Sequence, residues 1–126
     1  MKIIMTDFLN AYLVTALWSS IDDKENPFDD NYSIDDFSEK ALKQADKDCD
    51  LFIEKVRELS LLDKIYIGLL DETDIAHDFW LTRQGHGAGF WDGDYPDEIG
   101  DKLTEIANDF RELYIYVGDD GKLYFE

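Results

Sequence analysis

Residues 77–92 read HDFWLTRQGHGAGFWD and decide which fold class the chain is predicted to have. Residues 79–83 are a β-prone run. A glycine-rich turn at 85–89 follows, and the β-prone pattern resumes at Phe90 and Trp91. Two such runs on either side of a turn are typical of a β-hairpin. We therefore expect Trp80 and Trp91 to stack across the two strands, in the core rather than exposed as an interface anchor.

The residues before this segment predict two helices. Apolar residues near the start recur at three and four positions, so a helix capped by Thr6 or Asp7 should run to about Trp18. Residues 22–31 are typical of a solvated loop, and Ser38 begins a longer helix. The apolar face of that helix consists of Leu42, Ala45, Cys49, Phe52, Ile53, Val56 and Leu59.

The residues after it predict a third helix and a second hairpin. Pro96 stands at a helix start, and residues 113–117 and 122–125 are β-prone runs around a Gly-Asp turn. Residues 64–70 fit either a strand or a helix. The predicted fold is one α+β domain over residues 1–126, in which a small antiparallel sheet of three to four strands, from two hairpins, packs with two to three helices.

The charge of the chain indicates which partners it can bind. Thirty acidic residues against twelve basic ones give a net charge of −18, of which residues 22–50 carry −7 and residues 92–126 carry −8. Such a field repels nucleic acid and anionic membranes and attracts basic protein surfaces. We therefore expect a basic nucleic-acid-binding protein as partner, with no direct nucleic acid and no membrane. A homodimer is an open alternative that would extend the negative surface.

Composition indicates a folded protein of a reducing compartment. Hydrophobic residues make up 44% of the chain and aromatic residues 14%, which is enough to supply a core. Residues 1–18 lack the basic start and unbroken apolar run of a signal peptide. Because Cys49 is the only cysteine, no internal disulfide can form, and a cytoplasmic location is expected.

Acidic residues in the predicted third helix follow a regular spacing. Asp97 is followed at every fourth position by another carboxylate, which places a row about 6 Å apart along one helix face. DNA phosphates lie at comparable intervals, so the row can engage Lys and Arg that otherwise hold a nucleic-acid backbone. The predicted partner-binding residues are Asp94, Asp97, Glu98, Asp101, Glu105 and Asp109, together with the loop residues Asp22, Asp23, Asp29 and Asp30. The alternatives are an ordinary solvated helix face and, for the loop, turn chemistry.

Catalytic and metal sites have only weak signals. His77 and His86 are the only histidines, and a metal could use them with Asp78, Asp92, Asp94 and Cys49. No paired CxxC, helical HxxxH or calcium loop accompanies them. The glycines are expected to serve a turn with positive φ rather than a phosphate cradle.

Two further residues have expected structural roles. Arg83 is expected to pair with Asp78 or Asp92 rather than to bind a substrate. Cys49 lies on an apolar stripe, so a buried and inert thiol is expected rather than a nucleophile.

Residues 77–92 resemble the carboxy-terminal signature of a family of small, acidic, mostly uncharacterised proteins from phages, prophages and plasmids. Similar stretches cover most of the chain, most weakly at residues 54–75. They are Phe8-Leu9, Ala16-Leu17-Trp18-Ser19-Ser20, Asn31-Tyr32-Ser33-Ile34-Asp35-Asp36 and Tyr116-Val117-Gly118-Asp119-Asp120-Gly121. Where the family tends to place a basic residue after its Trp-Asp, this chain has Gly93 and Asp94.

The resemblance implies a protein of a mobile element, and acidic phage proteins often resemble DNA. We therefore expect an anti-defence protein in the host cytoplasm that mimics DNA and blocks a host nucleic-acid-binding protein, such as a CRISPR or restriction effector. On this prediction it is not an enzyme and needs no cofactor or metal. Two alternatives stay open. One is a small metal-dependent enzyme or ligand-binding domain organised on the glycine-rich turn with His77, His86 and Asp92, and the other is a soluble phage accessory protein whose acidity serves solubility.

Overall fold

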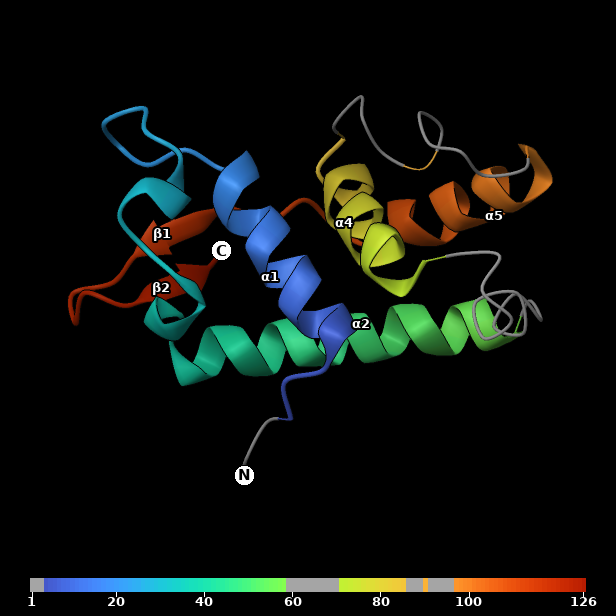
Figure 1. Cartoon of the computed structure of the whole chain (residues 1–126), viewed down its shortest axis with the longest axis horizontal. Helices are drawn as coiled ribbons and strands as arrows, with labels where there is room; N and C mark the ends of the chain where they lie inside the picture. Colours follow the sequence, from blue (N-terminus) through green and yellow to red (C-terminus); the bar gives the residue numbers. More distant parts are fainter. Residues whose placement is uncertain (1–3, 59–70, 86–89, 91–96) are drawn as a thin grey trace.

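The computed structural model describes residues 4–58, 71–85, 90 and 97–126. Its elements are helix α1 (Asp7–Ser19), the short 3-10 turns η1 (Phe28–Asp30) and η2 (Ile34–Asp36), helices α2 (Glu39–Glu58), α4 (Glu72–Arg83) and α5 (Asp97–Asn108), and strands β1 (Ile115–Val117) and β2 (Leu123–Phe125). Helix α2 runs along one side of the molecule, with α1, α4 and α5 following one another across it (Figure 1). The hairpin lies at the opposite end from α5, beside α1 and the start of α2.

The predicted α+β class with a sheet of three to four strands is wrong. The described residues form four helices and one two-stranded antiparallel sheet. The error lies at residues 79–83, which belong to helix α4 and not to a strand. Asp71 caps this helix, because its carboxylate accepts hydrogen bonds from the backbone N–H groups of Thr73 and Asp74. Residues 79–83 are all buried, the polar Thr82 and the charged Arg83 included, so this part of the helix has no exposed face and its sequence shows no helical periodicity.

The core is built around the aromatic residues of α4. The Phe79 ring stacks on Phe52 of α2 with 4.1 Å between centroids, and it lies 5.3 Å from the Tyr12 ring and 4.9 Å from the Phe110 ring. Trp80 is fully buried, and its indole N–H donates to the Ser19 hydroxyl at 2.9 Å. The core position predicted for Trp80 is therefore confirmed. A cross-strand pair with Trp91 is wrong, because Trp80 is helical; Trp91 itself lies outside the described residues.

Three predicted helices are confirmed by their caps and burial. The Thr6 hydroxyl accepts from Leu9 N–H at the start of α1, and the Ser38 hydroxyl accepts from Ala41 N–H at the start of α2. Helix α5 begins at Asp97, directly after the predicted starting proline. No helix in the described part of the chain is long and apolar enough to cross a membrane. Residues 64–70, which fit either element, lie outside the described residues, as does Leu59.

The predicted C-terminal hairpin is confirmed, and its turn depends on two glycines. Gly121 adopts a positive φ of 80°, which a residue with a side chain rarely does. At Gly118 an added Cβ would collide with the Tyr124 ring, so a larger residue would require that ring to move. The backbone N–H of Ser38 donates to the carbonyl of Leu123, which joins β2 to the chain entering α2.

The stacked aromatic core generates a stability prediction. Replacing Phe79 with alanine should lower the free energy of unfolding by about 3–5 kcal/mol, because a cavity would replace a ring in contact with three other rings. The matched control is Val14→Ala on α1, where the side chain is 43% exposed and little change is expected. Urea denaturation followed by circular dichroism measures both, and equal losses would contradict the assigned core.

Candidate functional site

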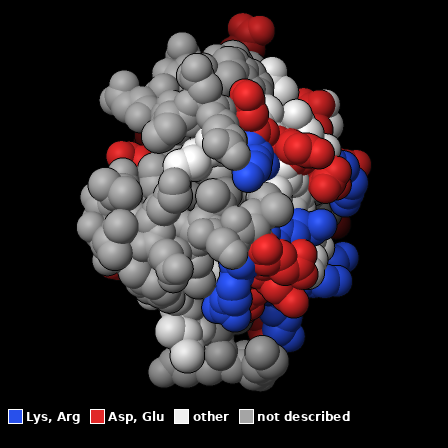
Figure 2. Space-filling view, turned by 90° about the vertical axis from the view of Figure 1, so that its right-hand side faces the viewer, with Lys and Arg blue, Asp and Glu red and all other residues white. Residues whose placement is uncertain are grey.

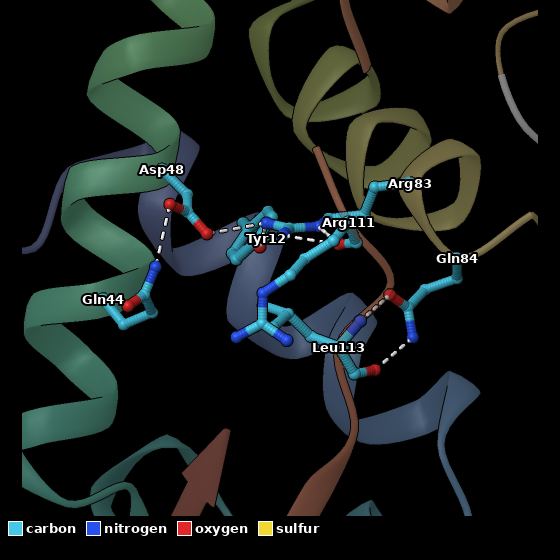
Figure 3. Close-up of polar contacts among 7 residues, drawn as sticks. All are labelled: Tyr12, Gln44, Asp48, Arg83, Gln84, Arg111 and Leu113. Carbon is cyan, nitrogen blue, oxygen red and sulfur yellow. Dashed lines mark hydrogen bonds and ion pairs between the residues drawn. The ribbon is translucent and has the colours of Figure 1, made fainter. Parts of the chain in front are cut away.

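The C-terminal end of α4 holds a buried cation. One guanidinium nitrogen of Arg83, Nη1, donates to Asp48 Oδ2 at 2.7 Å and to the Tyr12 hydroxyl at 2.9 Å. Its Nε and Nη2 both donate to the backbone carbonyl of Arg111, at 2.9 and 2.7 Å. The other Asp48 oxygen accepts from Gln44 Nε2 at 2.9 Å, so the carboxylate is paired on both sides (Figure 3).

This network has a structural role. It joins α1, α2, α4 and the segment before β1, and no buried side-chain N or O in the described residues lacks a hydrogen-bond partner. Burial raises the pKa of the Tyr12 hydroxyl far above its ordinary value, so the group stays neutral. The structural role predicted for Arg83 is confirmed, but its carboxylate partner among the described residues is Asp48 on α2 and not the predicted Asp78. The other predicted partner, Asp92, lies outside the described residues.

The side chains of the residues on either side of Arg83 also form hydrogen bonds with backbone groups of later segments. The Gln84 side chain donates from Nε2 to the carbonyl of Leu113 and accepts from its N–H at 2.8 Å, as one rung of a β-ladder would (Figure 3). The Thr82 hydroxyl accepts from the backbone N–H of Phe90 at 3.1 Å. The sequence interpretation missed Gln84, Asp48 and Tyr12, because no local pattern links them to partners 29 to 71 positions away.

The residues of the predicted metal alternative are described only in part. His77 Nδ1 lies 2.9 Å from Asp78 Oδ1, and the His77 ring stacks on Trp18 at 5.5 Å. Within the described ranges no three His, Cys, Asp or Glu side chains form a metal-binding group. His86, Gly87, Gly89, Asp92 and Asp94 lie outside those ranges. Gly85 has a positive φ of 71°, which agrees with the expected turn.

The connection from α1 to α2 presents an acidic surface. Residues 21–36 carry seven acidic side chains and one lysine, a net charge of −6. Asp22 Oδ1 accepts from the backbone N–H groups of Lys24 and Asn26 at 2.9 and 3.0 Å, which is the turn chemistry of the alternative reading. Across the described residues, no hydrogen bond or ion pair engages the exposed carboxylates of Asp23, Asp29, Asp30 and Asp35.

The described acids on and just after α5 lie on an exposed surface, and one of them has a basic neighbour. Asp101 and Glu105 are exposed on the helix, whereas Asp109 lies just beyond its end with a carboxylate oxygen 3.9 Å from Lys55 Nζ of α2. Figure 2 shows this end of the molecule, where carboxylates alternate with Lys and Arg side chains over the described part of the face. Asp94 and the side chains of Asp97 and Glu98 lie outside the described residues.

The acidic segment of residues 21–36 and the acidic face of α5 are not brought together. The segment of residues 21–36 lies at the hairpin end of the molecule, and α5 lies at the other end (Figure 1). The predicted partner-binding residues whose side chains are described therefore belong to two separate surfaces. The first surface borders a hollow of about 450 Å³, whose lining includes the apolar side chains of Ile21, Phe28 and Tyr32 and whose far wall is β1.

No known protein-family model, curated protein or solved structure matches the chain. The resemblance of residues 77–92 to a family of phage and plasmid proteins therefore stays a prediction. Assignment of function depends on the chemistry of the surfaces described above.

The buried ion pair generates a second stability prediction. Arg83→Met should lower the free energy of unfolding by about 3–5 kcal/mol, because it leaves the buried Asp48 carboxylate without its cation. Adding Asp48→Leu should recover part of that loss, since the unpaired charge is removed. The control is Lys43→Met, which removes an exposed pair with Glu39 and should change little. Urea denaturation compares the variants, and a loss no larger than that of the control would refute the role of Arg83.

Cys49 generates a prediction about reactivity. The side chain is buried, and burial raises the pKa of its thiol well above the ordinary value, with the neighbouring Asp48 carboxylate adding to the effect. Native protein should therefore resist iodoacetamide at mildly alkaline pH, whereas urea-unfolded protein should gain one adduct. Mass spectrometry of the intact chain measures both, and rapid modification of the native protein would contradict the buried placement.

Proposed function

We propose that this protein is a non-enzymatic inhibitor that binds a basic, nucleic-acid-binding host protein and covers the surface on which DNA or RNA is normally held. In this proposal it acts as an anti-defence protein of a phage or other mobile element, with a target such as a CRISPR or restriction effector. The observation that carries the proposal is the surface of residues 21–36, where free carboxylates lie beside exposed apolar side chains.

The free carboxylates supply attraction and competition. A surface of net charge −6 within a chain of net charge −18 steers a basic protein toward it and speeds association. Asp23, Asp29 and Asp30 are exposed and unpaired in the described structure, so a partner's Lys or Arg can reach them without breaking an existing ion pair. The same Lys and Arg would otherwise contact phosphates, so nucleic acid and this protein would compete.

The apolar side chains beside these carboxylates can form the buried centre of an interface, which charged groups alone do not provide. Ile21 is 62% exposed and Tyr114 is 60% exposed, and both line hollows next to the acidic segment. Interfaces of specific complexes combine such a centre with a polar rim, whereas an acidic face that serves only solubility needs no apolar centre. This combination favours binding of a protein over the accessory alternative.

The first experiment is affinity capture from lysate of a bacterial host, with the tagged protein as bait. We expect a nucleic-acid-binding protein to be retained at low salt, and to be released by high salt and by competing duplex DNA or RNA. Mass spectrometry identifies it. Retention of a protein that nucleic acid does not displace, or of no specific protein, would contradict the proposal.

Two variants of equal charge change identify the surface that acts. Asp23→Asn, Asp29→Asn and Asp30→Asn together remove three charges from the α1–α2 connection. Asp101→Asn, Glu105→Gln and Asp109→Asn remove three from α5, where Lys55 already faces Asp109. We expect the first variant to weaken capture at least about tenfold more than the second. The reason is that the first set of charges would contact the partner directly, whereas the second set would act on it only at long range. Equal weakening would show that only net charge matters and would contradict a defined binding surface.

A further inference from the structure

Strand β1 has one edge that faces away from its partner strand. Tyr114 and Glu126 exchange both backbone hydrogen bonds, at 3.1 and 2.8 Å, and the register pairs Tyr116 with Tyr124 two positions on. Antiparallel pairs alternate between bonded and non-bonded positions, so the backbone N–H and C=O groups of Ile115 and Val117 point outward.

This outer edge is only partly covered. At its first position the Gln84 amide bonds both backbone groups of Leu113, in place of a neighbouring strand. Throughout the described structure, the outward backbone groups of Ile115 and Val117 have no hydrogen-bond partner. The outer edge of β2 differs, because Ser38 N–H bonds the carbonyl of Leu123 there. Among the described residues the outward backbone groups of Phe125 on β2 also have no hydrogen-bond partner, so both outer edges have open positions. The edge of β1 is the one that lines the hollows described next.

A groove follows the open edge. One hollow of about 270 Å³ extends from Gln84 along β1, and a second of about 450 Å³ continues to Val117. Ile21 and Ile115 line both hollows, so the two hollows are adjacent to each other along β1. The wall opposite β1 is formed by the end of α1, the loop after it and η1.

The charge of the groove selects its occupant. Its described lining includes the carboxylates of Asp22, Asp23 and Glu112 and one basic side chain, Lys24. A second copy of a chain with net charge −18 would bring the same acids against these, so self-pairing is disfavoured. A segment rich in Lys or Arg is complementary to it.

We propose that this groove binds an extended, basic segment of the partner protein, which adds to the open edge of β1 as a further strand. The inference rests on the proposed function for the basic nature of the partner. Backbone groups of Ile115 and Val117 provide the ladder bonds, and the apolar lining at Ile21 takes alternate side chains of the segment. The remaining side chains, which are Lys or Arg, face Asp22 and Asp23.

The test uses a short peptide of alternating lysine and valine as the probe. Its binding to the full chain is measured by fluorescence anisotropy and by amide hydrogen exchange with NMR. In the free protein the amides of Ile115 and Val117 should exchange fast and that of Tyr116 slowly. Peptide should protect the first two, and a peptide methylated at every backbone nitrogen should bind at least about tenfold more weakly.

A variant that keeps every charge provides the second arm. Val117→Pro removes an outward N–H that β2 does not use, so the hairpin bonds stay, and circular dichroism checks the fold. We expect about tenfold weaker peptide binding. No binding of the lysine–valine peptide, binding without protection of Ile115 and Val117, equal binding of the methylated peptide, or self-association of the free protein through this edge would overturn the inference.

The same variant separates the two proposals. If Val117→Pro captures the nucleic-acid-binding protein from lysate as well as the parent chain does, the edge proposal fails and the proposed function stands. If peptide protects Ile115 and Val117 but no nucleic-acid-binding protein is captured, the groove takes basic segments and the proposed function fails.

Discussion

A buried guanidinium needs a partner for its charge and for its N–H groups, and the packing around Arg83 meets both requirements from other parts of the chain. Asp48 supplies the charge, Tyr12 supplies a hydroxyl and the backbone carbonyl of Arg111 accepts two further bonds. Because an unpaired charge in the core is costly, these groups must come together for the chain to fold. The Arg83 side chain is thus a common fixed point, which connects helices α1, α2 and α4 to the segment leading into β1 (Figure 3).

The position of the hairpin follows from this fixed point. Arg83 bonds to the backbone at Arg111, and the C-cap residue of α4, Gln84, bonds to it again at Leu113. Strand β1 begins two residues later, so its outer edge is directed along the loop that follows α1. The distinctive string at residues 77–92 therefore builds the scaffold at its described positions, and Trp80, Leu81 and Gln84 of the string also line one end of the groove.

The distribution of acidic residues along the sequence differs from their distribution over the folded surface. Charge is high in two blocks of the sequence, residues 22–50 and 92–126, and the fold divides the second block: α5 lies at one end of the molecule, whereas the hairpin lies at the other end with residues 21–36 (Figure 1). At the α5 end, acidic and basic side chains alternate on the described surface (Figure 2). At the hairpin end, Asp23, Asp29, Asp30 and Asp35 have no ion pair among the described residues, and their segment borders a groove with both polar and apolar side chains. The same chain therefore has two acidic surfaces of different composition.

The sequence by itself determined the elements whose signals are local. Helices α1, α2 and α5 have caps or a starting proline and apolar residues at helical spacing, and the final hairpin has its Gly-Asp turn. Tertiary structure decided the rest. Phe79 and its neighbours have strand-like composition but form a helix, because burial on all sides outweighs a weak local preference. The Asp48 partner of Arg83, the Lys55 neighbour of Asp109 and the open edge of β1 depend on contacts between distant residues, which no spacing along the chain encodes.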